Sequence, residues 1–311
     1  MNCLNDIISN YDMAVKCLAS RHLENVIRFR SKIDMVFDML SDEDSKYIYA
    51  QDILYCMLSN FVIQELSAFI AGNMTWPEFR EVVRRARSMR EFDLVEHQGT
   101  PVSEEVKYQC LATTFLLEQY RYKDFVRILP GDVCIDAGAC LGDTSLYFCR
   151  NGAQKVYSFE IDQSNVRCLR KTVRNYALDQ QIEVCEAALA DRAGKMFFTP
   201  DPGNNGAGKV SMTQGEGSYA VPTTTIDAFC KENGVHPSFI KMDIEGAEPA
   251  AIQGARQTIL DDRPRLAISI YHAWQHRWEL PLMLRDITPG YDYYVKKSQP
   301  YTETILLAVP R

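Results

Sequence analysis

Several features of metal-binding, exported and membrane proteins are missing from this 311-residue sequence. The ten cysteines are scattered, no CxxC pair occurs among them, and no spacing is typical of a zinc site. No signal peptide is apparent, and no apolar run reaches the roughly 18 residues that a membrane span needs. We therefore predict a protein of the reducing cytoplasm with no membrane partner.

An excess of basic residues is missing too. The chain has 34 lysines and arginines against 41 acids, which gives a net charge of −7. Proteins that bind nucleic acid usually present a basic face, so we predict no nucleic-acid partner. The one dense basic run, Arg84 to Arg90, is interpreted as a solvated helix face. Hydrophobic residues make up 46% of the chain, which is enough for a sizeable core.

Strand-like alternation is absent from residues 1–101. Apolar residues there recur three and four apart, which predicts amphipathic helices. Ser41 is the expected N-cap of one helix. Residues 96–103 contain Gly, Pro and Ser, which is typical of a domain boundary. The apolar stripe in residues 47–66 is wide enough to need burial, so we expect this region to act as a lid or to form a homodimer.

From residue 102 onward, short apolar strands alternate with helical segments. The expected strands are 133–136, 155–161, 182–189, 239–244 and 265–272, and the expected helices are 143–150, 163–177, 225–233 and 247–260. Such alternation predicts an α/β fold with a mostly parallel sheet covered on both faces. The segments "YDYYVKK" and "TETILLAVP" are separated by a short turn and predict an antiparallel C-terminal hairpin that completes the sheet.

Residues 201–217 hold five glycines and few side chains that would form a core. The segment suits either a mobile lid over a ligand or an exposed loop between two extra strands, "KMFFT" and "AVPTTTI". We favour the loop, because irregular connections usually run over the surface.

The stretch "IDAGACLGDT" joins the first expected strand to a helix. Gly138 and Gly142 allow the sharp turn, but no lysine follows Gly142 as a P-loop requires. Cys140 stands where a dinucleotide-binding turn needs its second glycine. The acids Asp136 and Asp143 would repel a phosphate from the helix N-terminus. The turn therefore favours a ligand without phosphate, and preferably a cationic one.

S-adenosylmethionine has this chemistry, because it carries a sulfonium and an ammonium group and no phosphate. We expect Asp136 to face the ammonium end, directly or through water. Glu160, at the end of the second strand, is expected to accept hydrogen bonds from the ribose hydroxyls. Asp162 fits better as the cap of the next helix. Residues 186–189, after the third strand, are expected to lie along the adenine.

Longer motifs then indicate a family. The segments "IDAGACLGDTSLYF", "VYSFEIDQSNVRCLRKTV", "AALADRAGK", "TTTIDAF" and "FIKMDIEGAEPAAIQGA" stand in the order seen in FkbM-type methyltransferases, and the sequence resembles that family from Gly131 to Arg311. The resemblance implies the Rossmann-like, seven-stranded fold of S-adenosylmethionine-dependent methyltransferases in residues 102–311. It also implies O-methylation of hydroxyl groups on natural products and sugars.

The helices that precede this domain resemble, less specifically, those of some bacterial members. Cys140 departs from the polar or aromatic residue that is more common at its position. The positions expected to bind the cofactor are Asp136, Gly138, Ala139, Cys140, Gly142, Asp143, Thr144, Glu160, Ile161, Ala187, Ala188 and Asp243.

An alcohol is a poor nucleophile, so methyl transfer to it needs in-line alignment and a group that helps to remove the proton. The fourth strand and the turn after it carry "KMDIEGAE", where Lys241 and Asp243 project to one side. We expect Asp243 or His272 to be the base or an orienting group, with Glu245 shaping the pocket. Lys241 either stabilises a developing alkoxide or pairs with Asp243.

Three further residues follow the fifth strand. His276 and Trp274 are candidates for the acceptor pocket, whereas Trp278 is expected to pack. Carboxylates converge in this region in a way that would suit Mg²⁺, but no ligand spacing demands an ion and we predict no metal.

The leading hypothesis is an S-adenosylmethionine-dependent O-methyltransferase that acts on a hydroxyl of a small molecule or glycan. The alternative is a regulatory or partner protein that binds S-adenosylmethionine without catalysis, and the polar residues of "KMDIEGAE" argue against it. A nicotinamide-dependent reductase is disfavoured by Cys140 and by the acids at the turn.

Overall fold

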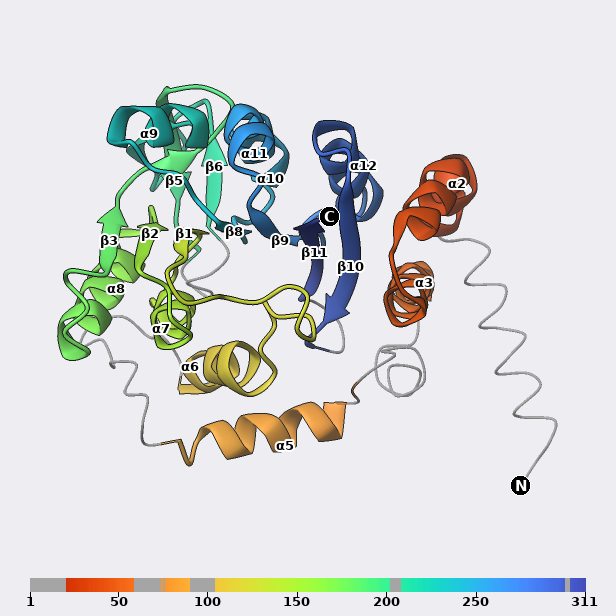
Figure 1. Cartoon of the computed structure of the whole chain (residues 1–311), viewed down its shortest axis with the longest axis horizontal. Helices are drawn as coiled ribbons and strands as arrows, with labels where there is room; N and C mark the ends of the chain where they lie inside the picture. The colour runs from red at the N-terminus through yellow and green to blue at the C-terminus, as the bar shows by residue number, and fades with distance from the viewer. Residues whose placement is uncertain (1–20, 59–73, 75, 90–103, 202–207, 300–302) are drawn as a thin grey trace.

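The computed structural model describes residues 21–58, 74, 76–89, 104–201, 208–299 and 303–311. Its main element is a seven-stranded sheet with the order β10-β11-β9-β8-β1-β2-β3 (Figure 1). The strands are β1 Val133–Ala137, β2 Lys155–Phe159, β3 Ile182–Cys185, β8 Phe239–Met242, β9 Arg265–Ser269, β10 Tyr291–Lys297 and β11 Thr304–Pro310. The predicted seven-stranded α/β fold is confirmed.

Five of these strands form parallel pairs, and β11 pairs antiparallel with both β9 and β10, so β11 alone among the seven runs in the opposite direction. The predicted C-terminal hairpin is therefore present. The strand order reverses between β1 and β8, because the chain runs outward to β3 and then returns to the other side of β1. Ligands of open parallel sheets bind at the carboxyl ends of the strands at such a reversal.

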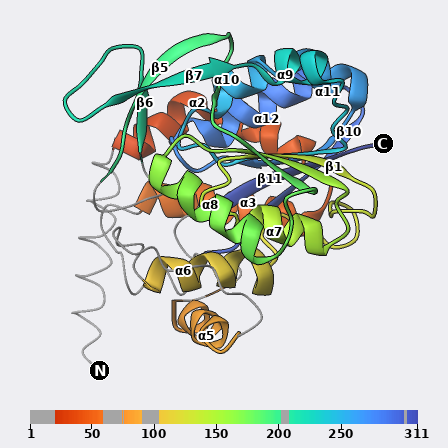
Figure 2. The same cartoon turned by 90° about the vertical axis from the view of Figure 1, so that its left-hand side faces the viewer.

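Helices cover both faces of the sheet. They are α7 Asp143–Arg150 and α8 Gln163–Asn175 on one face, and α9 Ile226–Asn233, α10 Glu248–Gln253, α11 Arg256–Asp262 and α12 His276–Ile287 on the other (Figure 2). The side chains of β1 alternate between these layers. Ile135 and Ala137 pack in the core with α9 to α12, and Cys134 packs in the core with α7 and α8.

Two predicted elements are split in the structure. The predicted strand 182–189 ends at Cys185, and its last residues form β4 Ala188–Leu189 in a second sheet of order β4-β7-β5-β6. Ala188 there pairs with Thr223 of β7, so pairing partners that are distant in sequence decide where the strand ends. The other strands of this sheet are β5 Gly194–Thr199, β6 Lys209–Ser211 and β7 Tyr219–Thr224.

The predicted helix 247–260 is divided at Gly254 into α10 and α11. A Cβ atom at Gly254 would lie 2.1 Å from the carbonyl oxygen of Ala190, so the backbone of another segment passes close by. The two extra strands predicted to flank the glycine-rich segment are present as β5 and β7, while residues 202–207 lie outside the described residues.

The N-terminal region contains α2 Arg21–Met39, α3 Glu43–Leu58, α5 Trp76–Ala86 and α6 Glu104–Leu111, which continues into the π-helix η1 Ala112–Leu116. Helix α2 lies against α12, and α3 lies against β10 at the edge of the sheet (Figure 1). The ring of Phe29 stacks on Trp278 with 5.1 Å between centroids, and Trp278 is fully buried. Trp278 therefore packs, as predicted.

The start of α3 differs from the prediction. Asp42 caps the helix, because its Oδ1 accepts a hydrogen bond of 2.9 Å from the amide of Ser45. Ser41 instead accepts a 2.9 Å hydrogen bond from the amide of Tyr293, because the chain pairs here with the edge strand β10.

Arg84 is exposed and pairs with Glu81 on α5, which fits a solvated helix face. No helix among the described residues is long and apolar enough to cross a membrane. The predicted boundary at 96–103 lies outside the described residues, and the homodimer stays a prediction.

A buried ionic cluster joins α3 to α12 and to the C-terminal hairpin of β10 and β11. Asp52 of α3 is 1% exposed and contacts the side chains of Arg277, Lys297 and Thr304. Although burial raises the pKa of the Asp52 carboxyl, Arg277 and Lys297 outweigh it and lower that pKa to about 2. The carboxylate is therefore ionised, and it forms ion pairs with two buried cations.

We predict that Asp52→Asn lowers the free energy of unfolding by about 3–5 kcal/mol, because it removes a negative charge that faces two buried cations. Urea unfolding of the full chain measures the change. The matched control is Asp34→Asn on α2, whose side chain is 60% exposed and pairs with Arg30 at 3.4 Å; it should cost no more than about 1 kcal/mol. Equal losses in the two variants would contradict the prediction.

Candidate active site

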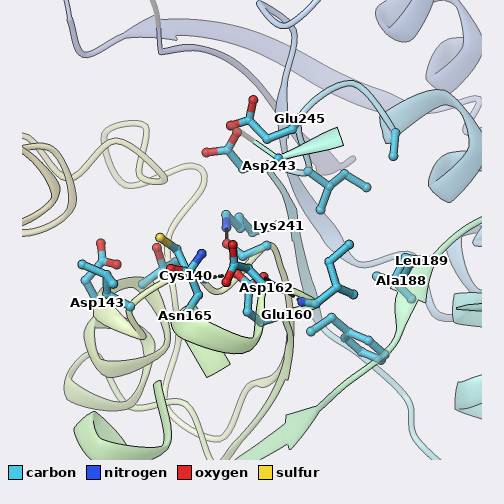
Figure 3. Close-up of a pocket in the computed structure, with 18 of the residues that line it drawn as sticks. Cys140, Asp143, Glu160, Asp162, Asn165, Ala188, Leu189, Lys241, Asp243 and Glu245 are labelled. Atoms are coloured by element: carbon cyan, nitrogen blue, oxygen red, sulfur yellow. Dashed lines mark hydrogen bonds between the residues drawn. The ribbon is translucent and has the colours of Figure 1, made fainter. Parts of the chain in front are cut away.

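A cavity of about 760 Å³ lies at the carboxyl ends of β1, β2 and β8. Its wall combines the turn after β1, the end of β2, β4 to β6, the turn after β8 and the segment from α6 to Tyr120. Figure 3 shows Glu160, Asp162 and Asn165 on one side, Asp243 and Glu245 on another, and Lys241 between them. The cavity lies at the strand-order reversal, where the sequence pattern predicts the ligand.

The turn after β1 contains three residues with left-handed backbone, Gly138, Cys140 and Gly142. Gly138 has φ +78°, and a Cβ atom there would lie 1.9 Å from the carbonyl oxygen of Asp243. Cys140 has φ +47°, which is uncommon for a residue other than glycine. The amide of Cys140 donates a 2.9 Å hydrogen bond to Oε2 of Glu160. The turn thus joins β1 to the ends of β2 and β8.

Of the other residues predicted from this turn, Gly142, Asp143 and Thr144 stand at the start of α7. Asp143 and Thr144 line the cavity, whereas Gly142 and Ala139 do not. Oδ2 of Asp143 accepts a 2.6 Å hydrogen bond from Thr114 of η1, and burial raises the pKa of the Asp143 carboxyl.

Asp136 has a different place from the one predicted. Its side chain is fully buried beneath the turn and does not line the cavity. Ser145 donates a 2.6 Å hydrogen bond to Oδ2, and Nζ of Lys241 lies 3.0 Å from Oδ1. The expectation that Asp136 faces the ammonium end of a cofactor is therefore corrected, because the side chain points toward α7 and is neutralised within the sheet.

Lys241 is the partner of Asp136 rather than of Asp243. Its ammonium group also donates to the carbonyl oxygens of Ala137 at 3.1 Å and Gly138 at 2.6 Å. Although burial lowers the pKa of Lys241, the charges of Asp136 and Asp243 outweigh it and raise the pKa. The predicted pairing with Asp243 is therefore corrected, because Lys241 pairs with Asp136 and holds the turn after β1 in place. Its expected contact with a developing alkoxide stays a prediction.

Glu160 lines the cavity at the end of β2, as predicted. Its Oε1 accepts hydrogen bonds from the amides of Ile161 at 2.7 Å and Asp162 at 2.8 Å, in addition to the bond from Cys140. Burial raises the pKa of the Glu160 carboxyl despite these bonds. Asp162 caps α8 by accepting from the amide of Ser164 at 2.7 Å, which confirms its predicted role.

The apolar part of the cavity is formed by Ile161, Ala187, Ala188 and Leu189, together with side chains from β5 and β6. The first three belong to the predicted cofactor positions. The contribution of β5 and β6 could not be predicted, because it depends on how the second sheet folds over the end of β2 and β3.

Asp243 follows the end of β8 and lines the cavity. Tyr120 donates a 2.9 Å hydrogen bond to its Oδ2, and Nε2 of His272 lies 3.3 Å from its Oδ1. Burial raises the pKa of the Asp243 carboxyl, but His272 and Lys241 outweigh it and lower that pKa overall.

His272 lies behind these carboxylates and does not line the cavity. Burial lowers its pKa, but the neighbouring carboxylates of Glu245, Glu248 and Asp243 outweigh this and raise the pKa to about 11. An imidazole with that pKa is already protonated at neutral pH. The expectation that His272 is a base is therefore corrected, and its expected role as an orienting group stays a prediction.

His276 and Trp274 do not line the cavity either. His276 is 4% exposed, and its Nδ1 lies 3.5 Å from Oε2 of Glu248. Burial lowers the pKa of His276, so its imidazole is neutral. These two residues therefore do not line the cavity as predicted, because His276 lies against Glu248 and the ring of Trp274 packs on Trp278.

The cavity residues that the sequence analysis missed include Tyr120, Tyr271 and Glu303, which surround Asp243. The hydroxyl of Tyr271 lies 3.3 Å from Oδ1 of Asp243 and 3.1 Å from Oε1 of Glu303. Burial and the charge of Asp243 raise the pKa of Glu303 to about 8. Tyr271 adjoins His272 in the motif "YH", but nothing in the sequence marked Tyr120 or Glu303, which the fold brings in from distant segments.

A model of the Methyltransferase FkbM domain matches residues 136–295, slightly more than half of the chain. This chain belongs to the FkbM methyltransferase family. The resemblance drawn from the sequence motifs is thereby confirmed. No curated protein sequence matches the chain.

Solved structures agree with the fold of this FkbM family member. A methyltransferase FkbM from Methylobacillus flagellatus has a TM-score of 0.61 at 18% identity, and the match covers 92% of this chain. The chain spans 60% of the length of that protein.

Two weaker matches are a putative rRNA methylase from Clostridium thermocellum and the fibrillarin of Aeropyrum pernix with natively bound S-adenosylmethionine. The methylase has a TM-score of 0.42 at 10% identity and covers 63% of this chain and 93% of its own. The fibrillarin has a TM-score of 0.41 at 14% identity and covers 62% of this chain and 74% of its own. Neither likeness is strong enough to bear on function.

We predict that Gly138→Ala destabilises the protein by roughly 3 kcal/mol or more, because it adds a clash with the backbone of Asp243 to the strain of a left-handed residue. The matched control is Gly131→Ala, where φ is +90° and a Cβ atom would meet nothing within 4 Å. The control should lose only the conformational part, about 1–2 kcal/mol. Urea unfolding measures the free energy of unfolding of both variants. Equal losses would contradict the prediction that the clash with Asp243 adds to the cost.

Proposed function

We propose that this FkbM family methyltransferase uses S-adenosylmethionine to methylate a hydroxyl group of a small molecule or sugar. The observation that carries the proposal is the charge of the cavity. Six acidic side chains line it, and the one basic side chain among its described lining residues, Lys241, is paired with Asp136. The acidic side chains are Asp143, Glu160, Asp162, Asp243, Glu245 and Glu303, and of these Glu303 has a pKa of about 8. Such a cavity suits a cationic cofactor and disfavours a phosphate-bearing one.

The residues present fit S-adenosylmethionine in two further ways. Three backbone amides hold the carboxylate of Glu160 in place and leave acceptor capacity toward the cavity for a ribose hydroxyl. Ile161, Ala188 and Leu189 offer apolar contact for the adenine. Bound there, the cofactor would supply a methyl group on a positively charged sulfur.

The polar end of the cavity suits an alcohol. The carboxylate of Asp243, held by Tyr120, is placed to accept a hydrogen bond from an acceptor hydroxyl and so to orient its oxygen. The oxygen becomes more acidic as it forms its bond to carbon, so a carboxylate with a lowered pKa is still able to take the proton. Tyr271 and Glu303 add hydrogen-bonding groups that suit an acceptor with several hydroxyls. A protein that only binds the cofactor would have no need of this cluster.

The cofactor assignment is tested by calorimetry with S-adenosylmethionine and NADH. We expect S-adenosylmethionine to bind and NADH not to bind. Glu160→Gln should weaken S-adenosylmethionine binding about 10- to 100-fold, because a hydrogen bond to a charged group contributes about 1.5–3 kcal/mol. Glu183→Gln on the neighbouring strand β3, where Glu183 pairs with Lys155, should leave the affinity unchanged. Tight binding of NADH alone would refute the assignment.

The role of Asp243 is tested by transfer of a labelled methyl group to a panel of sugars and polyhydroxylated small molecules. We expect Asp243→Asn to bind S-adenosylmethionine and to lose about 10²- to 10⁴-fold in turnover, as expected when a group that accepts a proton is removed. Asp261→Asn on the exposed face of α11, where Asp261 contacts Gln257, is the control and should keep full turnover. Full turnover in Asp243→Asn would exclude Asp243 from proton transfer.

A further inference from the structure

We propose that His272, Asp243 and Glu245 form a binding site for a divalent cation, with Glu248 as the residue that orients His272. The three proposed ligands come from the turn after β8 and the segment after β9, which are neighbours in the sheet. Asp243 and Glu245 line the cavity, and His272 lies directly behind them. An ion bound here would therefore sit at the wall of the cavity, beside the proposed acceptor.

Glu248 fixes the orientation of the imidazole. Nδ1 of His272 lies 2.8 Å from Oε1 of Glu248, and a carboxylate only accepts, so Nδ1 carries the hydrogen. The amide of Ile244 donates to the same oxygen at 2.9 Å, and Glu248 is fully buried. A histidine whose first ring nitrogen donates to a buried carboxylate, and whose second ring nitrogen faces other ligands, is the arrangement of metal-binding histidines.

The second ring nitrogen has no proper hydrogen bond. The side chain of His272 is 6% exposed, yet Nε2 makes no hydrogen bond. It lies 3.3 Å from Oδ1 of Asp243 and 3.6 Å from Oε1 of Glu245, whereas charge-assisted hydrogen bonds are about 2.7–2.9 Å long. Two ligand atoms that share an ion at about 2.1 Å lie roughly 3.0–3.4 Å apart. The spacing of Nε2 from these two carboxylate oxygens is therefore closer to that of ligands around an ion than to that of hydrogen-bonded atoms.

The charge around His272 also favours a divalent cation. Three carboxylates, Asp243, Glu245 and Glu248, surround one imidazole, so a single proton on Nε2 leaves an excess of negative charge. The nearby ammonium group of Lys241 is already paired with the carboxylate of Asp136. His276, which faces the other oxygen of Glu248, is buried and neutral. A divalent ion in place of the proton would neutralise more of this charge.

Two carboxylates and one imidazole suit Mn²⁺ or Mg²⁺, and the cavity side leaves room for acceptor oxygens to complete the coordination. For what the ion does, the inference rests on the proposed function. An ion at this position would bind the acceptor hydroxyl and help it to lose its proton during methyl transfer. Glu248, held by Ile244 and His272, serves as a positioning residue and not as a ligand.

The test is a Mn²⁺ titration of the full, untagged chain, freed of metal with EDTA and followed by electron paramagnetic resonance of free Mn²⁺. We expect one bound ion per chain that Mg²⁺ displaces. His272→Gln, Asp243→Asn and the exposed substitution Glu245→Gln should each weaken binding, and Glu248→Gln should weaken it about 10- to 100-fold. The matched control is His236→Gln, because His236 also pairs with a carboxylate, Asp262 at 2.8 Å, but is 80% exposed and precedes β8. It should bind Mn²⁺ as the wild type does.

The inference is overturned if the wild type leaves Mn²⁺ free, or if Glu245→Gln and Glu248→Gln bind it as tightly as the wild type. Glu245 is in an exposed turn, so this variant gives an answer even where His272→Gln fails to fold. Calorimetry with S-adenosylmethionine on the same samples separates the two proposals. Cofactor binding without Mn²⁺ binding overturns the metal site alone, and Mn²⁺ binding without cofactor binding overturns the proposed function alone.

Discussion

A buried ion pair between Lys241 and Asp136 joins the two central strands of the sheet at the point where the cavity begins. The same lysine donates to the carbonyl oxygens of Ala137 and Gly138, so one side chain links β8 to the turn after β1. Removing either partner would leave the other charge buried without compensation, which costs several kcal/mol. The path of the turn, the close approach of Gly138 to Asp243 and the amide bond from Cys140 to Glu160 all depend on this arrangement.

This pair also decides the electrostatics of the cavity. Because Lys241 is neutralised from behind by Asp136, the carboxylates on the cavity side have no basic partner of their own among the described lining residues. They face one another instead, and the raised pKa of Glu303 is one result of that crowding. A cationic methyl donor and a divalent ion are two ways to relieve the same excess of negative charge. The proposed cofactor site and the proposed metal site therefore share one physical cause.

Local patterns predicted the elements whose ends are set by local signals. Helix α7 begins and ends as expected, and α8 begins where Asp162 caps it. Predictions failed where a distant segment decides the outcome. The strand after Ile182 is broken because Ala188 pairs with β7, and the helix after Ala247 is broken where Gly254 meets the backbone of Ala190. Asp42 caps α3 in place of Ser41, because the hydroxyl of Ser41 accepts a hydrogen bond from Tyr293 of the edge strand β10.

The sequence alone determined the fold class, the family and the turn that borders the cavity, because strand and helix periodicities, glycine spacing and acids at strand ends are local properties. Only the tertiary structure decided which acids face the cavity. Asp136 and Glu160 look alike in sequence, as each ends an apolar strand, yet Asp136 is directed toward α7 and Lys241 while Glu160 reaches the cavity. Likewise, Tyr120, Glu303 and Asp243 are separated by long stretches of chain and meet only because the sheet order places their strands and loops together. The direction of a side chain depends on what packs on each face of its strand, and that information is spread over the whole chain.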